Sequence, residues 1–138
     1  MKPSTFNLDA RRLIALSTVF CVLALGAAAQ STKIQGAKAC DYYVRATFVS
    51  GNCTTPGTVD PSPTCVLVPA NTSVILTSSG ASYTFLRKLE AWCAPTMCTG
   101  TLDMEWTCTP NMISGFCCNG IEQVIQGSPE NGFQIIAR

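Results

Sequence analysis

Cysteine is the residue of this 138-residue chain whose chemistry is most distinctive, because there are nine. Five of them lie in the block Cys93–Cys118, and four precede it. A zinc site would need reduced thiols, typically as a C-x2-C pair, whereas Cys93 and Cys98 are separated by four residues and the chain has no histidine. We therefore expect these cysteines to form disulfides, and we expect no metal site and no cofactor.

Paired carboxylates are the other candidates for chemistry. The missing histidine removes Ser-His-Asp, Cys-His and histidine-ligated metal catalysis. Asp103 and Glu105 remain, and on a strand two such positions share one face. Glycosidases use two carboxyl groups about 5–10 Å apart. We favour the simpler interpretation that both are solvated residues of an amphipathic strand, and expect no enzyme activity. A small carbohydrate-active hydrolase that uses Asp103 and Glu105 is the alternative.

Residues 1–29 have the pattern of a secretory signal peptide. A basic start that includes Arg11 and Arg12 precedes an apolar run, Leu13–Gly26, which is too short for a membrane span. The small residues Ala27–Ala29 then fit a cleavage site before Gln30. We expect a secreted, extracellular protein with no membrane span after cleavage.

Cleavage would remove Cys21 and leave an even number of cysteines. In a short exported chain this predicts four disulfides, and about 105 pairings are possible. Cys117 and Cys118 are adjacent and could bond each other only through a strained ring, so we expect them to reach different partners. The eight are Cys40, Cys53, Cys65, Cys93, Cys98, Cys108, Cys117 and Cys118.

The charge of the chain argues against strongly anionic partners. After residue 29 the chain carries six Lys or Arg and seven Asp or Glu, with no basic cluster. Nucleic acid and anionic membranes are therefore not expected as partners. We expect an extracellular protein or a polysaccharide as the partner instead.

Short strands are predicted along most of the exported part. Apolar and polar residues alternate over 42–49 and 101–108, as in strands with one wet face. Further apolar runs predict strands at 65–69, 73–77, 121–126 and 133–137, the first two possibly as a hairpin. Residues 83–93 fit a strand or a short helix, and we favour the strand because short isolated helices are marginal.

These elements predict a mainly β fold: a small, disulfide-stapled antiparallel sandwich or barrel, possibly with one short helix at 83–93. Residues 40–138 are expected to form a single cysteine-rich domain after a flexible polar lead-in at 30–39. The Pro- and Gly-rich segments 51–64 and 94–100 are expected to be loops that present contacts to a partner.

Several exposed positions are candidates for contacts or modification. Trp92, Tyr43 and Arg45 could contact a partner, with core packing as the alternative for Trp92. Trp106 shares its parity with apolar neighbours and is expected in the core. Asn52 and Asn71 each begin an N-glycosylation sequon in a predicted loop.

The leader, the short exported chain, its eight cysteines and the lack of a catalytic motif together resemble the small secreted cysteine-rich proteins of plant-associated fungi and other microbes. Hydrophobins are excluded because they have two Cys-Cys pairs, and three-finger toxins because no cysteine follows Cys118. The resemblance implies a non-catalytic binding protein with an effector or defence role at a host or microbial surface. A structural wall or surface-coat protein is a further alternative.

Overall fold

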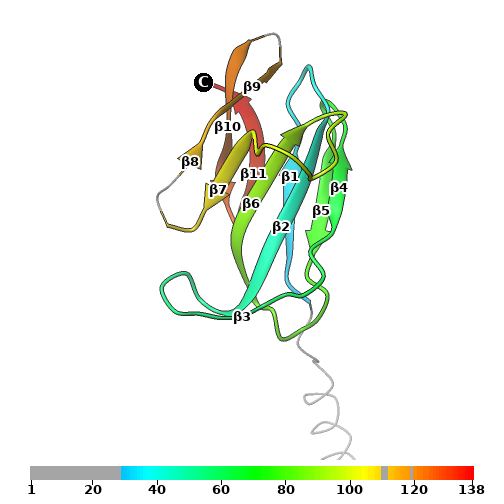
Figure 1. The fold of residues 1–138 in the computed structure, drawn as a ribbon. Helices are drawn as coiled ribbons and strands as arrows, with labels where there is room; N and C mark the ends of the chain where they lie inside the picture. Colours follow the sequence, from blue (N-terminus) through cyan, green and yellow to red (C-terminus); the bar gives the residue numbers. More distant parts are fainter. Residues whose placement is uncertain (1–28, 110–111, 119) are drawn as a thin grey trace, which may run out of the picture.

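Two curled β-sheets make up the fold in this computed structural model, which describes residues 29–109, 112–118 and 120–138 (Figure 1). The signal peptide predicted at 1–29 lies outside the described residues, apart from Ala29. The described residues form strands and turns and no helix, which confirms the predicted mainly β fold.

The first sheet has five strands. In spatial order they are β5 (Ser73–Thr77), β1 (Ser31–Gln35), β11 (Gly132–Ala137), β10 (Ile121–Ser128) and β9 (Gly115–Cys118). The β1–β11 pair is parallel and the other pairs are antiparallel, so the sheet departs from the wholly antiparallel arrangement that we expected.

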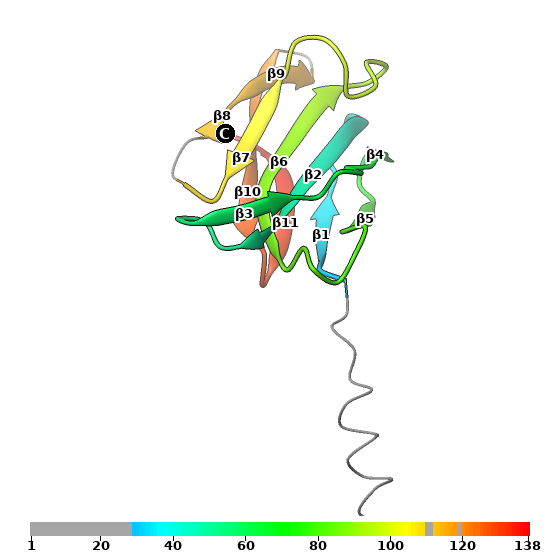
Figure 2. The same cartoon turned by 60° about the horizontal axis from the view of Figure 1, so that its bottom comes forward.

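The second sheet is antiparallel and is built around two long strands, β2 and β6. Its order is β3 (Pro56–Val59), β2 (Tyr42–Gly51), β6 (Phe85–Cys93), β7 (Met104–Thr107) and β8 (Met112–Ile113), while β4 (Cys65–Val68) also pairs with β2. Figure 2 brings forward the end of the molecule at which β3 lies.

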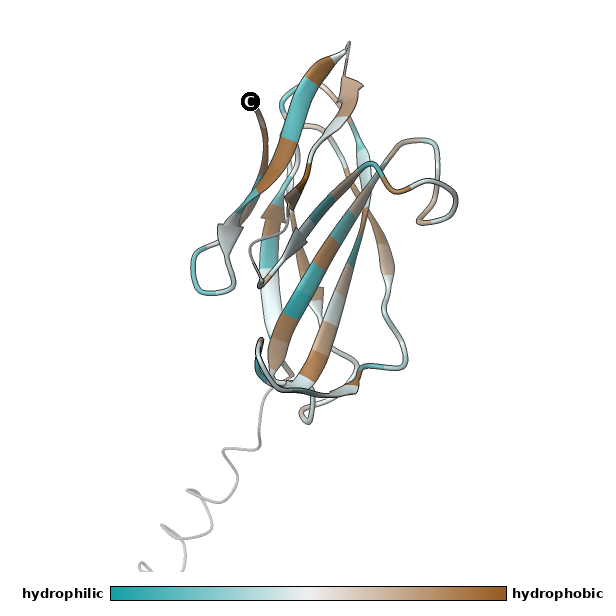
Figure 3. Ribbon diagram, turned by 60° about the vertical axis from the view of Figure 1, so that its left-hand side comes forward, coloured by the Kyte–Doolittle hydropathy of each residue, from teal (hydrophilic) through white to brown (hydrophobic). Residues whose placement is uncertain are grey.

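Alternation of side chains explains why these segments form strands, and Figure 3 shows hydrophobic and hydrophilic residues following one another along them. In β2, Tyr42, Val44 and Ala46 are buried, whereas Tyr43 and Arg45 between them are partly exposed. The apolar residues face the first sheet, where Ile34, Ile125, Phe133 and Ile135 complete one core. Trp106 packs edge-on against Phe133 in this core, as expected.

The segment 83–93, for which the sequence allowed a strand or a short helix, contains the strand β6 (Phe85–Cys93). A register shift lies in the β2–β6 pairing, where Thr47 faces Lys88 and Phe48 faces Leu86. Arg87 is the extra residue at this bulge. The bulge lets both Leu86 and Leu89 reach the core although their spacing breaks the period of two.

The prediction of a flexible lead-in at 30–39 is wrong. Residues 31–35 form β1, an interior strand that pairs with β5 on one side and β11 on the other. Thr32 and Ile34 of this strand are buried. The segment appeared polar because Ile34 is its one large apolar residue. It forms a strand because β5 and β11 supply backbone hydrogen bonds on its two sides.

Two further expectations need correction. The loop expected at 51–64 contains the short strand β3, which pairs with the end of β2. The runs around 65–69 and 73–77 do form strands, but not a hairpin: β4 pairs with β2 and β5 with β1, so the connection passes from one sheet to the other. The chain from β8 to β9 also crosses between the sheets, because β8 pairs with β7 of the second sheet and β9 pairs with β10 of the first.

Candidate binding face and disulfide framework

The eight cysteines that we expected to pair form four disulfides. Cys117 and Cys118 bond to different partners, as the strain argument predicted. The four pairs are Cys40–Cys118, Cys53–Cys108, Cys65–Cys98 and Cys93–Cys117.

The disulfides divide into an inner and an outer set. Cys93 lies opposite Tyr42 on the core side of the second sheet, so the Cys93–Cys117 bond joins that sheet to β9 of the first. Cys65 lies opposite Arg45 on the outer side, so its bond to Cys98 holds the loop 94–100 against the outer surface. The Cys53–Cys108 bond lies at the edge of the same surface.

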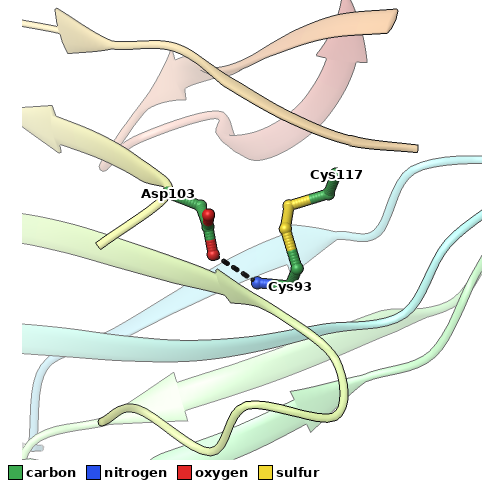
Figure 4. Close-up of side chains that lie close together, drawn as sticks. All are labelled: Cys93, Asp103 and Cys117. Carbon is green, nitrogen blue, oxygen red and sulfur yellow. Dashed lines mark hydrogen bonds between the residues drawn. A yellow bond between two sulfur atoms is a disulfide. The ribbon is translucent and has the colours of Figure 1, made fainter. Parts of the chain in front are cut away.

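Asp103 lies beside the inner disulfide (Figure 4). Its carboxylate accepts a hydrogen bond from the backbone N–H of Cys93 at 2.8 Å, and it lies within 4.8 Å of both sulfurs of the Cys93–Cys117 pair. These three residues have the composition of a metal site, but the two sulfurs are bonded to each other and provide no thiolate. Asp103 instead fixes the end of β6.

Tyr42 interacts electrostatically with Asp103 of this cluster. Burial, and then the charge of Asp103, raise the pKa of its hydroxyl to about 12. The hydroxyl oxygen lies 3.4 Å from the sulfur of Cys118. Tyr42 is therefore a neutral, packed residue at ordinary pH.

The outer side of the second sheet carries an ion-pair network centred on Glu90. One carboxylate oxygen accepts from Arg45 at 3.0 Å, and the other accepts from Lys88 at 2.8 Å. Side-chain exposure is 9% for Glu90 and 33% for each of the two cations. Two cations thus hold an almost buried carboxylate between the buried residues Leu89 and Ala91.

Trp92 does not lie at the surface. It is 3% exposed, and the Arg45 guanidinium lies 5.0 Å from the centre of its ring. It occupies the outer side of β6, opposite Tyr43, where Cys65–Cys98 holds the loop 94–100. The prediction that Trp92 contacts a partner is therefore wrong in this conformation, whereas Tyr43 and Arg45 remain partly exposed.

A groove of about 370 Å³ lies next to this network. Arg87, Lys88 and Glu105 line it with charges, and Thr47 and Thr107 line it with hydroxyl groups. The Cys53–Cys108 disulfide and Thr109 complete its wall. We call the outer side of the second sheet, with this groove and the loops 51–64 and 94–100, the binding face.

The two candidate catalytic carboxylates do not meet in this groove. Glu105 lines the groove and lies directly across the strand pair from Glu90. Asp103 instead faces the Cys93–Cys117 disulfide and is engaged by the Cys93 N–H. The expectation that strand alternation brings both to one face fails because β7 begins at Met104, so Asp103 lies before the regular strand.

Both predicted glycosylation sites lie at the surface. Asn71 is exposed in the connection between β4 and β5. Asn52 is also exposed, and its side-chain oxygen accepts hydrogen bonds from the backbone and hydroxyl groups of Thr54 and Thr55. Modification of either residue stays a prediction.

Sequence reasoning missed Glu90, Lys88 and the role of Arg87. A signal for Glu90 was present, because it lies between Leu89 and Ala91 in an apolar segment, and such a residue needs a cation partner. Its partner Arg45 is distant in sequence, and pairing β2 with β6 was necessary to find it.

Comparisons with protein-family models, with curated proteins and with solved structures find no match for this chain. Among the residues that the structure describes, there is no helix with the length and hydropathy needed to cross a membrane.

Proposed function

We propose that this chain is a secreted, non-catalytic binding protein that uses the binding face to hold an extracellular partner at a host or microbial surface. The observation that carries the proposal is the placement of two of its four disulfides. Cys53–Cys108 and Cys65–Cys98 fix irregular loops on one side of the second sheet, next to the charged groove.

Disulfides at these positions favour binding for an energetic reason. A loop that is disordered before binding loses conformational entropy when a partner orders it, and this loss reduces affinity. Cross-linked loops have lost that freedom already, so their contacts contribute more fully to affinity. The Arg45–Glu90–Lys88 network orders the side chains beside the groove in the same way.

The chemistry of the groove favours a hydroxyl-rich partner, and we propose a polysaccharide. Arg87 and Lys88 offer hydrogen-bond donors, Glu105 offers acceptors, and Thr47 offers a hydroxyl group within one groove. A sugar ring carries several hydroxyl groups, each of which can both donate and accept hydrogen bonds. Mixed charges along the groove give no electrostatic preference for a strongly anionic polymer.

Secretion is supported by the disulfide count together with the N-terminal pattern. Four disulfides in so short a chain form and persist in an oxidising compartment. The separation of Asp103 from Glu105 supports the absence of hydrolysis, because two-carboxylate glycosidases hold both groups on either side of one bond.

Retention on insoluble polysaccharides tests this proposal. The secreted protein is mixed with cellulose, chitin, β-glucan and xylan, and the bound fraction and any released reducing sugar are measured. We expect retention on at least one polymer and no release of sugar. Release of sugar that is lost in Asp103→Asn would instead support the hydrolase, and retention on none would contradict the polysaccharide proposal.

Matched substitutions locate the contact. Arg87→Ala removes an exposed cation from the groove, whereas Lys33→Ala removes an exposed cation from the first sheet. A hydrogen bond to a charged group contributes about 1.5–3 kcal/mol, so we expect Arg87→Ala to weaken retention about tenfold or more. Equal retention by the two variants would contradict the assignment of the binding face.

A further inference from the structure

A second cavity, of about 430 Å³, opens between the segment that follows β1 and the strands β10 and β11. It shares no lining residue with the groove on the binding face. An inference from this cavity is therefore independent of the proposed function.

The cavity exists because β1 leaves its partner early. The register of β1 with β11 ends at Gln35 and Gln134. The chain then turns towards the β4–β5 connection, where the N–H of Gly36 donates to the carbonyl of Thr72 at 2.8 Å. A Cβ at Gly36 would lie 2.7 Å from the carbonyl oxygen of Pro69, so glycine permits this close approach.

Apolar side chains form most of the cavity lining. Ile135, Ala37 and Cys118 belong to the core, and Ala137 lies near the end of β11. Ile121 lines the cavity as well although it is 51% exposed, so a ligand in the cavity would cover apolar surface that now contacts water. A volume of this size is typical of sites for small molecules.

One residue that lines the cavity has a buried polar atom without a partner. Gln123 lines the cavity and is 5% exposed, and its side-chain oxygen Oε1 accepts no hydrogen bond. Gln123 lies opposite Ala137 across the β10–β11 pair, and so on the same side of the sheet as Ile125 and Ile135. A buried acceptor without a donor costs about 1–3 kcal/mol, which a ligand with a donor would recover.

We propose that this cavity binds a small, largely apolar molecule that carries one hydroxyl or N–H group. The apolar part would lie against Ile121, Ile135 and Ala137, and the donor would reach Oε1 of Gln123. Apolar contact would supply most of the affinity, and Gln123 would select ligands that have a donor.

Two probes of the same size separate these contributions. n-Octanol has a hydroxyl donor, whereas its isomer heptyl methyl ether has an oxygen without a donor. Methyl-resolved NMR titration of the secreted protein is expected to show shifts at Ile121, Ile135 and Ala137. We expect octanol to bind about threefold to tenfold more tightly than the ether, since a neutral hydrogen bond contributes about 0.5–1.5 kcal/mol net.

Three variants complete the test. Gln123→Leu is expected to abolish the preference for octanol, whereas Gln126→Leu, at an exposed position on the same strand, is expected to preserve it. Ala39→Trp places a large side chain on an exposed residue of the lining and is expected to weaken both probes. This variant and the wild-type comparison keep the test decisive if Gln123→Leu does not fold. Equal affinity for both probes, or shifts that avoid the cavity, would overturn the proposal.

Discussion

Asp60 and Ser79 join two connections that are distant in sequence. The Asp60 carboxylate accepts hydrogen bonds from the backbone N–H of Ser79 at 2.7 Å and from its hydroxyl group, and also from the N–H of Ser62 at 3.0 Å. Asp60 follows β3, and Ser79 follows β5, so this contact ties the second sheet to the first. Asp60 is 3% exposed.

Asp60→Asn should therefore destabilise the fold. The amide has nearly the same shape, but its NH₂ group must face at least one of the three donors around the carboxylate and cannot accept a hydrogen bond from it. We expect the free energy of unfolding to fall by about 1–3 kcal/mol, measured by chemical denaturation. Glu130→Gln changes an exposed carboxylate and serves as the control, with no expected change.

The same contact predicts a dependence on pH. Burial alone would raise the pKa of Asp60, but the hydrogen bonds from Ser79 and Ser62 outweigh it and hold the pKa below its ordinary value of 3.8. The stabilisation is complete above that value and is lost as the pH falls through the lower pKa of the folded state. The stability difference between wild type and Asp60→Asn should shrink over this acid range. A constant difference would show that the charge is not responsible.

Sequence patterns predicted the strands that bury alternate residues, and they failed where tertiary partners decide the outcome. The alternation in β2 holds from Tyr42 to Phe48, so the strand and its inner face could be identified directly. In β1 the pattern is carried by Thr32 and Ile34 alone, and its strand state depends on β5 and β11, which are both distant from it in sequence. The disulfide pairing was likewise not deducible, because it follows from how the sheets pack.

The candidate site shows the same division. The sequence identified Tyr43 and Arg45 as outward residues, and the structure leaves both partly exposed on the outer side of the second sheet. It could not identify the burial of Trp92, because the contact of its ring with Arg45 depends on the pairing of β2 with β6. Gln123 gave no signal at all, since its unpaired oxygen depends on the gap that opens beyond β1.

The interior strand β1 gives a third prediction. Ile34 is fully buried in the core, so Ile34→Ala should lower the free energy of unfolding by about 2–5 kcal/mol, because a cavity replaces the lost contacts. Lys33→Ala on the exposed side of the same strand should change it by less than about 0.5 kcal/mol. Thermal and chemical denaturation measure both. Equal effects would contradict the placement of this segment inside the first sheet.

Substitution by glutamine should change the stability of the fold differently at Glu90 and at Glu105. Glu90→Gln removes a nearly buried charge from Arg45 and Lys88, and we expect a loss of about 1–3 kcal/mol. Glu105 lies directly opposite Glu90, so Glu105→Gln removes a repulsion and should be neutral or slightly stabilising. Chemical denaturation compares the two variants. An equal loss of stability in both would contradict the ion-pair network.

The Cys65–Cys98 disulfide should control the exposure of Trp92. Replacing both cysteines by serine frees the loop 94–100, and we expect tryptophan emission to shift to the red, with a loss of about 3–4 kcal/mol in stability. The control is the corresponding Cys53, Cys108 double variant, which should lose similar stability without the shift in emission. Emission that is unchanged in both would show that the loop does not cover Trp92.

Disulfide mapping of the protein secreted by a eukaryotic host tests the central claim most directly. Intact mass before and after reduction and alkylation should show no free thiol, eight thiols after reduction, and a chain that begins near Gln30. Peptide mass spectrometry, with fragmentation between Cys117 and Cys118, should then identify Cys40–Cys118, Cys53–Cys108, Cys65–Cys98 and Cys93–Cys117. Free thiols, or cross-links that join Cys53 or Cys65 to other partners, would contradict the disulfide-bounded binding face.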